Sequence, residues 1–353
     1  MSEDHAVDGA AAEMLPLMEA QLLGQPPHLT RVDVAAQAGV PLAVAVELWR
    51  LLGFPQMDDD VVAFTDADVT ALRLAGDLID LGILPADSQA ALVRTWGRSF
   101  ARLAEWQVDM LAQLVTDAAT AGSDEGDPAG PHGEDGPTDA VVGVLPKIEE
   151  LQNYAWRRHL ASAAGRALSD GRAAAGEAAV PQGVCFVDIV GYTSRSRELD
   201  ETGLVDWLEA FEDRASRVAL DHGGRVIKTI GDEILIVAGT AHDAAAVAWE
   251  LTRRGADPED PFPAVRAGVA WGAVVARLGD VCGPTVNIAA RLTSHARPGA
   301  VLVDRGAHDV LCPDHAERPT GSVPGPWRLK RLSRTSVKGY SRLESWVLRE
   351  PRG

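Results

Sequence analysis

The sequence predicts an α+β fold with a mixed sheet, preceded by an all-helical region. Up to about residue 120, apolar residues recur at helical spacing with short connections between the runs. From Gly183 onward, β-branched runs alternate with helical segments in the order of a β-α-β-β-α-β core, the ferredoxin-like split-βαβ arrangement. A chain of 353 residues is long enough for two domains that each bury a core.

Changes in composition set the expected boundaries. Residues 1–120 form the helical domain, and residues 121–138 form an acidic linker rich in glycine and proline. Residues 139–182 hold a connecting helix and a joint of small residues, and residues 183–353 form the α+β domain. The connecting helix is placed where it could transmit a change between the domains, although packing is the commoner role of such a helix.

Local signals locate the helices of the first domain. Thr30, with Asp33 three residues later, resembles a capping box and predicts a helix that ends at Gly39. The other helices expected in this half cover Ala10–Leu23, Leu42–Leu52, Thr65–Leu81, Pro85–Met110 and, after the linker, Ala140–Leu168.

Leu29–Gly53, followed by Phe64–Leu72, resembles the helix-turn-helix of MerR-type regulators. DNA binding would require cations on the second helix, because phosphate contacts supply most of the affinity for DNA. That helix offers Arg50 as its one cation and also carries Glu47. We therefore interpret the pair as packing within a helical bundle.

In the second domain strands and helices alternate. Strands are expected at 184–189, 225–237 (a hairpin), 264–271, 274–277, 301–303, 327–332 and 344–348, and helices at 203–222, 241–254 and 286–295. In the hairpin, Gly231-Asp232 lies between two β-branched runs, and glycine in the first of two loop positions predicts a type II′ turn. The hairpin therefore holds Asp232 at its tip and Lys228 on its first strand; in isolation these would be an ordinary turn aspartate and a surface lysine.

Asp188 lies inside the otherwise apolar strand Val184–Ile189. Because burying an unpaired carboxylate costs several kcal/mol, such an aspartate requires a cation. If Asp188 and Asp232 converge, two carboxylates, backbone carbonyls and a triphosphate would form an oxygen donor set that suits Mg²⁺ or Mn²⁺. Two ions about 4 Å apart could activate an attacking hydroxyl and stabilise a leaving phosphate. A turn or capping role is the alternative for each aspartate by itself.

Three segments carry a family resemblance: Phe186-Val-Asp-Ile-Val-Gly-Tyr-Thr193, Lys228-Thr-Ile-Gly-Asp232 and Asp280-Val-Cys-Gly-Pro-Thr-Val-Asn-Ile-Ala-Ala-Arg291. Over about residues 184–348, they resemble the catalytic domain of class III adenylate cyclases. Three separated motifs in the family's order are far more specific than one short pattern. The whole chain, with its helical first half and Tyr154–Leu160, also resembles actinobacterial cyclases with a pH-sensing regulatory domain.

The resemblance implies a role for each polar residue of these motifs. Asp188 and Asp232, with the backbone at Ile189, would hold two metal ions, Mg²⁺ or Mn²⁺, in each active site. Lys228 and Asp280 would read adenine, which presents an acceptor at N1 and a donor at N6. Guanine reverses this pattern, so a lysine donor with an aspartate acceptor predicts ATP rather than GTP.

Asn287 and Arg291 would stabilise the transition state. They are four residues apart on one helix and share a face, so that Asn287 can hold the ribose while Arg291 offers a planar fork to phosphate charge. In isolation, such a pair is usually a solvated helix face. The candidate phosphate ligands are the backbone of Gly191, Tyr192 and Thr193 at a helix start, and the side chain of Lys338.

The implied reaction is attack of the ribose 3′-hydroxyl of ATP on the α-phosphate, which releases pyrophosphate and 3′,5′-cyclic AMP. In the family each site forms between two catalytic domains, so a chain with all six side chains implies a symmetric homodimer, regulated by its helical half. The alternatives are a catalytically silent sensor or regulator and a diguanylate or guanylate cyclase. Ile230 stands where diguanylate cyclases have a motif glycine. Silent copies usually lose a metal aspartate or the arginine, and none of the six side chains is missing here.

Net charge limits which partners the protein can bind, and cysteine content indicates its redox compartment. A formal net charge of −18 argues against nucleic acid or an anionic membrane as partner. Cys185, Cys282 and Cys312 are scattered and odd in number, which fits a reducing compartment. The N-terminus lacks the pattern of a signal peptide and no apolar run reaches the length of a membrane span, so we expect a cytoplasmic protein without membrane insertion.

His159 is a candidate pH-responsive group in the connecting helix. It lies beside Arg157 and Arg158, and neighbouring cations resist the protonation of a histidine. A surface histidine is the commoner explanation. The sequence does not indicate the direction of any control.

Overall fold

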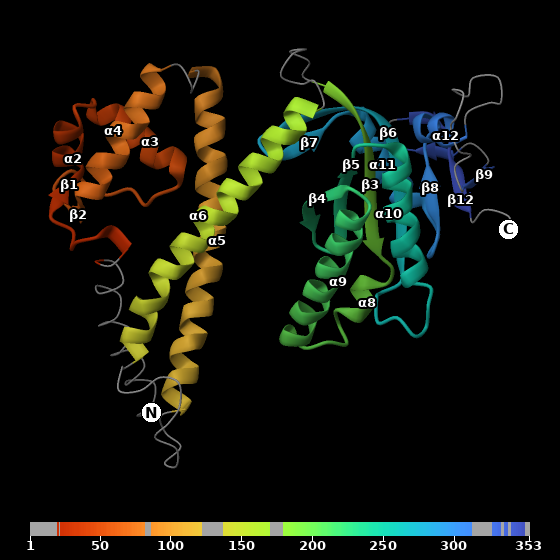
Figure 1. The fold of residues 1–353 in the computed structure, drawn as a ribbon, viewed down its shortest axis with the longest axis horizontal. Helices are drawn as coiled ribbons and strands as arrows, with labels where there is room; N and C mark the ends of the chain where they lie inside the picture. Colours follow the sequence, from red (N-terminus) through yellow and green to blue (C-terminus); the bar gives the residue numbers. More distant parts are fainter. Residues whose placement is uncertain are drawn as a thin grey trace. The chain divides into compact units, whose positions relative to one another are not determined.

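The computed structural model describes residue 20 and residues 22–81, 86–121, 137–169, 179–312, 327–332, 335–337 and 340–349. The chain divides into two compact units, Met1–Ala167 and Leu168–Gly353. Unit 1 is formed by helices with one short strand pair, and unit 2 by a mixed sheet with helices (Figure 1). The predicted α+β fold with a helical first part is confirmed.

The first helix of unit 1 has the capping box that the sequence predicts. α2 (Arg31–Ala38) starts at Thr30, which forms a capping box with Asp33, and ends at Gly39 with a φ of +74°. The other elements of unit 1 are β1 (Leu29–Thr30), α3 (Leu42–Leu52), β2 (Val62–Phe64), α4 (Asp66–Asp80), α5 (Ala86–Ala121) and α6 (Pro137–Ser169). The helix expected at 10–23 lies almost wholly outside the described residues.

The helix pair α2–α3 is bent by 113°, which agrees with the predicted helix-turn-helix shape. Ala45 and Trp49 of α3 are buried in the core of unit 1, and the Trp49 ring lies 4.8 Å from that of Phe64. Arg50 pairs with Glu47 of the same helix at 2.6 Å. This pairing supports our interpretation of α3 as a packing helix.

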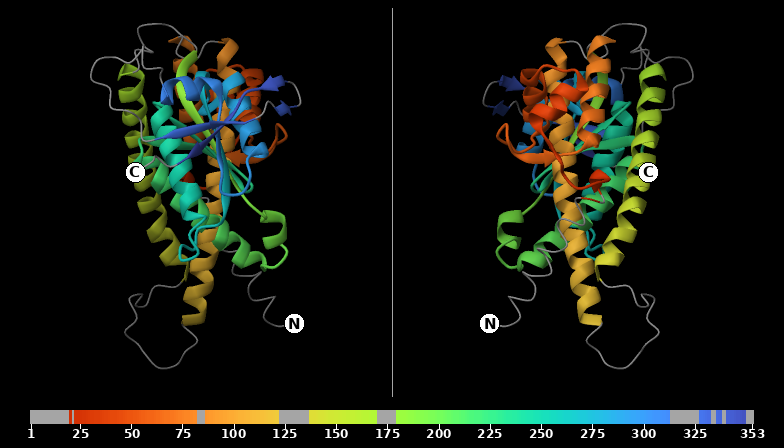
Figure 2. Two further views of the ribbon diagram at one scale, coloured as in Figure 1. Left: turned by 90° about the vertical axis from the view of Figure 1, so that its right-hand side faces the viewer. Right: turned by 90° about the vertical axis from the view of Figure 1, so that its left-hand side faces the viewer.

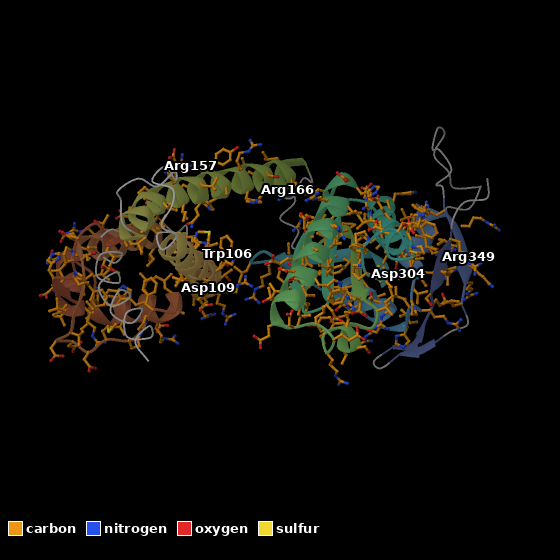
Figure 3. The ribbon with its side chains drawn as sticks, turned by 90° about the horizontal axis from the view of Figure 1, so that it is seen from below. Trp106, Asp109, Arg157, Arg166, Asp304 and Arg349 are labelled. Carbon is orange, nitrogen blue, oxygen red and sulfur yellow. The ribbon has the colours of Figure 1, made fainter. Side chains whose placement is uncertain are left out.

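α6 differs from expectation at its start. It begins at Pro137, so Pro146, which we expected near the helix start, lies in the helix interior. Arg157 and Arg166 project from α6 (Figure 3), and His159 is exposed between them. No single described helix is long and apolar enough to cross a membrane; α2 and α3 together meet that test only as a bent pair.

Within the described residues, unit 2 is built on an eight-stranded sheet in the order β4-β5-β3-β6-β8-β12-β9, with β7 paired to β6. Its strands are β3 (Ala179–Ile189), β4 (Gly224–Ile230), β5 (Glu233–Ala238), β6 (Val265–Arg277), β7 (Asp280–Cys282), β8 (Val301–Val303), β9 (Arg328–Arg331) and β12 (Trp346–Arg349). β10 (Thr335–Val337) and β11 (Tyr340–Leu343) form a separate hairpin. The order β6-β3-β5-β4 is that of the predicted split-βαβ core.

The helices of unit 2 are α8 (Tyr192–Arg195), α9 (Glu201–Asp221), α10 (Ala241–Arg254), α11 (Pro284–His295) and α12 (Arg305–Leu311). In the side views of Figure 2, α10 lies along the strands of the sheet. α12 was not expected from the sequence. Its N-cap is the buried Asp304, which is labelled in Figure 3. The Asp304 carboxylate accepts hydrogen bonds from Ala307 N–H of α12 and Trp271 N–H of β6, so it joins the two elements.

Two strand predictions were wrong. β6 is one strand rather than two, because Gly272 and Ala273 stay paired with Gln182 and Pro181 of β3. For the same reason β3 starts at Ala179, inside the segment that we expected to be a joint. Pairing with a long neighbour satisfies the backbone of residues whose own strand signal is weak.

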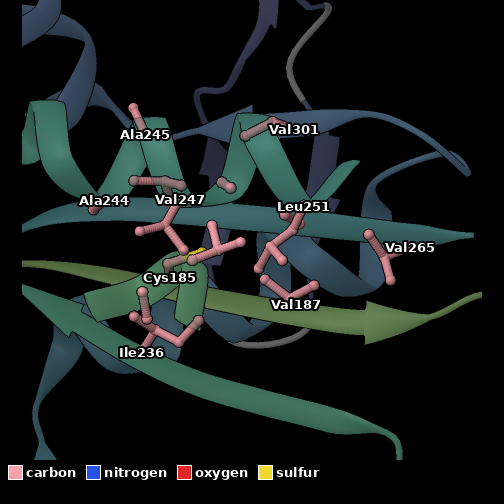
Figure 4. Packing of buried hydrophobic residues seen from close by; sticks show 14 of the residues in the cluster. Cys185, Val187, Ile236, Ala244, Ala245, Val247, Leu251, Val265 and Val301 are labelled. Atoms are coloured by element: carbon pink, nitrogen blue, oxygen red, sulfur yellow. The ribbon is translucent and has the colours of Figure 1, made fainter. Parts of the chain in front are cut away.

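The sheet carries apolar cores on both faces. One core packs α9, α10 and α12 against side chains such as Cys185 and Val187 of β3 and Ile236 of β5, and Figure 4 shows part of it around α10. The other packs α11 against Phe186 of β3 and Leu235 of β5. Cys185 lies in the first of these cores, and burial raises the pKa of its thiol.

Candidate active site

The end of β3 meets the tip of the β4–β5 hairpin. Ile230 pairs with Glu233, which leaves Gly231-Asp232 as a two-residue loop. Gly231 has a φ of +64°, whereas the φ of Asp232 is not positive. A positive φ at the first loop position alone agrees with the predicted type II′ turn. The Ile189 N–H donates to the Asp232 carbonyl at 3.1 Å. The structure therefore brings Asp188 and Asp232 to one corner of the sheet.

Three charged side chains form a row across the sheet at this corner. Glu233 of β5 and Arg266 of β6 are the direct cross-strand neighbours of Asp188 on β3. Arg266 donates from Nε to Asp188 Oδ2 at 2.6 Å, and its Nη2 lies 2.6 Å from the same oxygen. The Asp188 side chain is 14% exposed. Arg266 is thus the cation that a carboxylate in an apolar strand requires.

The corner concentrates negative charge. Burial, followed by repulsion from Asp188 and Asp232, raises the pKa of Glu233 to about 7, against a smaller opposing effect of Arg266. The pKa of Asp232 is also raised, mainly by burial and further by Asp188, although a backbone hydrogen bond opposes the shift. Carboxylates that repel one another in a half-buried corner are a donor set that a hard divalent cation suits.

The described residues contain no group of three or more His, Cys, Asp or Glu side chains arranged to hold a metal ion. Asp188 and Asp232 fit a hard cation as oxygen donors, but two side chains do not complete its shell. The Ile189 side chain is buried in the core, so only its backbone could contribute. Substrate phosphates and water would have to supply the remaining oxygens.

Lys228 and Asp280 form a second pair. Nζ lies 2.5 Å from Oδ2, and the two side chains are 41% and 49% exposed. Desolvation raises the pKa of Asp280, but the hydrogen bonds from Lys228 and from the Val281 N–H outweigh it, so that this pKa lies below its usual value. Asp280 begins β7, a strand that the sequence did not predict.

β7 places Asp280 beside β6 through a tight hairpin. Arg277 pairs with Asp280, and Leu278 and Gly279 between them have φ values of +53° and +81°. Positive φ at both loop positions is the signature of a type I′ turn. Lys228 is paired with Leu235, and Asp188 alternates with Phe186, so Lys228 and Asp188 belong to the sheet face that α11 covers.

α11 carries Asn287, which is exposed, and Arg291, which is half-buried. The helix packs closely on β6 at Gly268, where an added Cβ would lie 2.4 Å from Thr293 N and 2.5 Å from Ala289 O. This contact fixes the height of α11 above the sheet. It therefore fixes where Asn287 and Arg291 stand.

Of the candidate phosphate ligands, Gly191, Tyr192 and Thr193 start the short α8, and Lys338 lies outside the described residues. The first intrahelical bonds of α8 run from Ser194 and Arg195 to the Gly191 carbonyl, so the N–H groups before them point out of the helix start. The Tyr192 ring stacks on that of Trp207, with 6.1 Å between the ring centroids, and packs against the core.

Arg266 and Glu233 are the charged residues of the site that sequence reasoning missed. Arg266 could have been found by the same signal as Asp188, because each is the one charged residue in an apolar strand; for Arg266 the run is Val265–Ala270. A buried strand cation needs a carboxylate partner as much as a strand carboxylate needs a cation. The sequence showed both charges, but pairing them requires the register of β3 with β6.

Comparison with known proteins gives a consistent picture. Residues 177–350 match the family model described as the adenylate and guanylate cyclase catalytic domain. An adenylate cyclase of Glutamicibacter nicotianae is 37% identical over 310 residues, covering 84% of this chain and 74% of that protein. An adenylate cyclase of Streptomyces coelicolor is 37% identical over 296 residues, covering 83% of this chain and 74% of that protein.

A more distant relative is a pH-sensitive adenylate cyclase of Mycobacterium tuberculosis, 30% identical over 316 residues, covering 86% of this chain and 76% of that protein. Among solved structures, the adenylyl cyclase CyaB from P. aeruginosa aligns with a TM-score of 0.38 at 22% identity. That alignment covers 49% of this chain and 95% of that chain.

Proposed function

Because the chain belongs to the class III adenylate cyclases, we infer that it converts ATP to 3′,5′-cyclic AMP and pyrophosphate. Relatives named adenylate cyclase are 37% identical over more than four fifths of the chain, and the catalytic domain family covers unit 2. The fold agrees with this assignment. The residue roles, the metal ions, the dimer and the regulation that follow are proposals.

The Lys228–Asp280 pair carries the choice of ATP. The Lys228 ammonium can donate to adenine N1, and the Asp280 carboxylate can accept from the exocyclic N6 amino group. The two groups lie 2.5 Å apart, so both can reach one edge of one base. Guanine would place a carbonyl against the carboxylate and an N–H against the ammonium, which leaves both groups unpaired.

Asp188 and Asp232 would hold two Mg²⁺ or Mn²⁺ ions against the phosphates of ATP. When bound, such ions lower the pKa of the attacking 3′-hydroxyl and neutralise charge on the phosphates. The two aspartates orient the triphosphate in the corner between β3 and the hairpin tip. Burial raises the pKa values of Asp232 and Glu233, and repulsion from the neighbouring carboxylates adds to this rise, which supports a cation in this corner.

Asn287 and Arg291 would act from α11 on the sugar and the reacting phosphate. Asn287 can hydrogen-bond the ribose and hold its 3′-oxygen in line with the α-phosphate. Arg291 can donate to the phosphate oxygens on which charge accumulates in the transition state. The N–H groups at the start of α8, at Gly191–Thr193, and Lys338 are the proposed contacts of the outer phosphates.

We propose that the active sites form in a homodimer. Side chains that are 41% and 49% exposed, as Lys228 and Asp280 are in one chain, do not exclude water from a bound base. A second copy facing this side of the sheet would cover them and would bring its own aspartate corner to the same ATP. Symmetry then gives two sites in each dimer.

We propose that unit 1 regulates the cyclase, and that the signal is pH. The support is a relative named as pH-sensitive that matches 86% of this chain, which is more than unit 2 alone contains. His159 stays a candidate sensor; it is exposed on α6. If His159→Ala leaves the pH profile of activity unchanged, this residue is not the sensor. The cytoplasmic location also stays a prediction.

The test of function is product analysis with the full chain. Purified protein is incubated with ATP or GTP and with Mg²⁺ or Mn²⁺, and the products are separated. We expect cyclic AMP from ATP, loss of product in Asp232→Ala, and wild-type rates in Asp206→Ala, a matched change at an exposed aspartate of α9. No cyclic nucleotide from either substrate would favour a silent regulator instead.

A further inference from the structure

The strands β12 and β9 end the large sheet on the side remote from β4 (Figure 1). Arginine and lysine make up half of the residues of these two strands, and neither strand contains an acidic residue. The chain as a whole has 51 acidic and 33 basic residues. This end of the sheet therefore carries a local charge opposite to that of the whole protein.

The strand register places three of these cations on one face. Arg328 of β9 pairs with Arg349 of β12, which is labelled in Figure 3, and Lys330 pairs with Val347. Because cross-strand partners and residues two apart share a face, Arg328, Lys330 and Arg349 lie on the same side of the sheet. Leu329, between the two β9 cations, packs against the core on the opposite face.

The three cations have no counter-charge in the described part of the chain. All three side chains are exposed, and none has a hydrogen bond or an ion pair with another described residue. Arg331, on the opposite face of β9, differs: it pairs with Glu344, and its guanidinium carbon lies 5.9 Å from the centroid of the Trp346 ring. Like charges directly opposite each other, as Arg328 and Arg349 are, destabilise a strand pair. A negatively charged partner would relieve this repulsion.

The outer side of β9 is a strand edge. Among the described strands β9 pairs with β12 alone, so its other side presents backbone N–H and C=O groups without a strand partner. An extended peptide that adds to such an edge is held by main-chain hydrogen bonds and selected through its alternate side chains. Arg328 and Lys330 are two residues apart, so they would face acidic side chains at alternate positions of that peptide.

We propose that β9 is a docking edge for an acidic, extended segment of a partner protein. The segment adds to the sheet as a further strand and places alternate Asp or Glu side chains against Arg328 and Lys330. Arg349, one strand further in, adds to the local positive potential. The net charge of −18 does not prevent this contact, because exposed charges more than about 8 Å apart are largely screened at physiological salt. The proposal does not depend on the cyclase reaction.

Protection against aggregation is the competing explanation, because charged side chains on an edge strand deter pairing with other chains. A protective edge needs charge of either sign, whereas an edge that docks an acidic segment needs positive charge. Arg328→Glu with Lys330→Glu, the glutamate variant, keeps the edge charged and reverses its sign. Arg328→Gln with Lys330→Gln, the glutamine variant, is a milder change that removes the charge.

Binding is measured by fluorescence anisotropy at physiological salt, with the full chain and a short labelled peptide in which glutamate alternates with valine. We expect saturable binding to the wild type and at least about tenfold weaker binding to the glutamine variant, because two exposed ion pairs are lost. The glutamate variant should not bind. A second peptide, with proline in place of valine, has the same charge but cannot extend a sheet, and it should bind more weakly.

A matched control separates the patch from the net charge. Arg217→Glu with Arg297→Glu reverses two exposed arginines elsewhere in unit 2 and lowers the net charge by the same amount as the glutamate variant. This control should bind the valine peptide like the wild type. Circular dichroism at the assay temperature shows that each variant is folded.

Three results would overturn the proposal. The first is a wild type that does not bind the valine peptide, and the second is a folded glutamate variant that binds it as tightly as the wild type does. The third is equal binding of the proline peptide, which would indicate a surface for anions of any shape rather than strand addition. Loss of binding in the glutamate variant, with normal binding in the Arg217 and Arg297 control, supports the proposal.

Discussion

Replacing Gly268 by alanine tests whether the packing of α11 on β6 sets the catalytic geometry. The new Cβ would lie 2.4 Å from Thr293 N and 2.5 Å from Ala289 O, both backbone atoms of α11 that no side-chain rotation can move. Ordinary contact begins near 3.4 Å, so the helix and the strand must separate by about 1.0 Å (3.4 − 2.4). Overpacking of this kind costs about 1–3 kcal/mol of stability.

The same shift moves the side chains that α11 carries. Asn287 and Arg291 would leave the ribose and the phosphate by a similar distance, and a displacement of about 1 Å can lower a rate by roughly 100-fold. We therefore expect Gly268→Ala to reduce kcat by about this factor while ATP binding changes less. The assays are cyclic AMP formation at saturating ATP and urea unfolding of the full chain.

Two glycines serve as controls for this prediction. Gly239→Ala adds a Cβ with nothing within 4 Å and should change neither property. Gly183→Ala brings a Cβ 2.6 Å from Ala244 Cβ and 2.6 Å from Thr240 O, which disturbs α10 on the opposite face of the sheet. It should lower stability with a smaller loss of kcat. A Gly268→Ala protein as stable and active as wild type would refute the reasoning.

Three further predictions concern the Lys228–Asp280 pair, Glu233 and the hairpin tip. Lys228→Met with Asp280→Asn should lower kcat/KM for ATP by at least about tenfold, through lost hydrogen bonds to the base. It should change the free energy of unfolding by less than about 1 kcal/mol, because the pair is exposed. Steady-state kinetics and urea unfolding measure these two quantities, and a large loss of stability would contradict a role in base recognition alone. The pKa of Glu233 is raised in the folded state from its usual 4.5 to about 7, so the stability of chelator-treated protein should fall as pH rises from 4.5 through 7. Glu233→Gln should flatten that decline in unfolding experiments. An equal decline in both proteins would show that Glu233 is not its cause. Gly231→Val places a β-branched residue at a φ of +64°, so it should destabilise the hairpin by about 1–2 kcal/mol. It should also weaken Mn²⁺ binding through Asp232; urea unfolding measures the stability, and Mn²⁺ titration followed by electron paramagnetic resonance measures the binding. Unchanged binding would mean that the loop does not position Asp232.

Local chemistry made several features predictable. The capping box at Thr30 and the turn at Gly231 depend on residues two or three positions apart, and the structure contains both. The split-βαβ order followed from the alternation of strand and helix signals. The break expected within β6 failed because a glycine weakens a strand signal locally, while pairing with β3 holds the chain extended through Gly272.

By itself, the sequence determined the family, the fold class and the residues proposed for ATP, because motifs and periodicity are written in near neighbours along the chain. Tertiary structure decided which charges meet. Arg266 reaches Asp188 across 78 positions of sequence, and Lys228 reaches Asp280 across 52. Such pairs depend on strand register and on an unexpected strand, β7, and register is set by the packing of the whole sheet rather than by any local pattern.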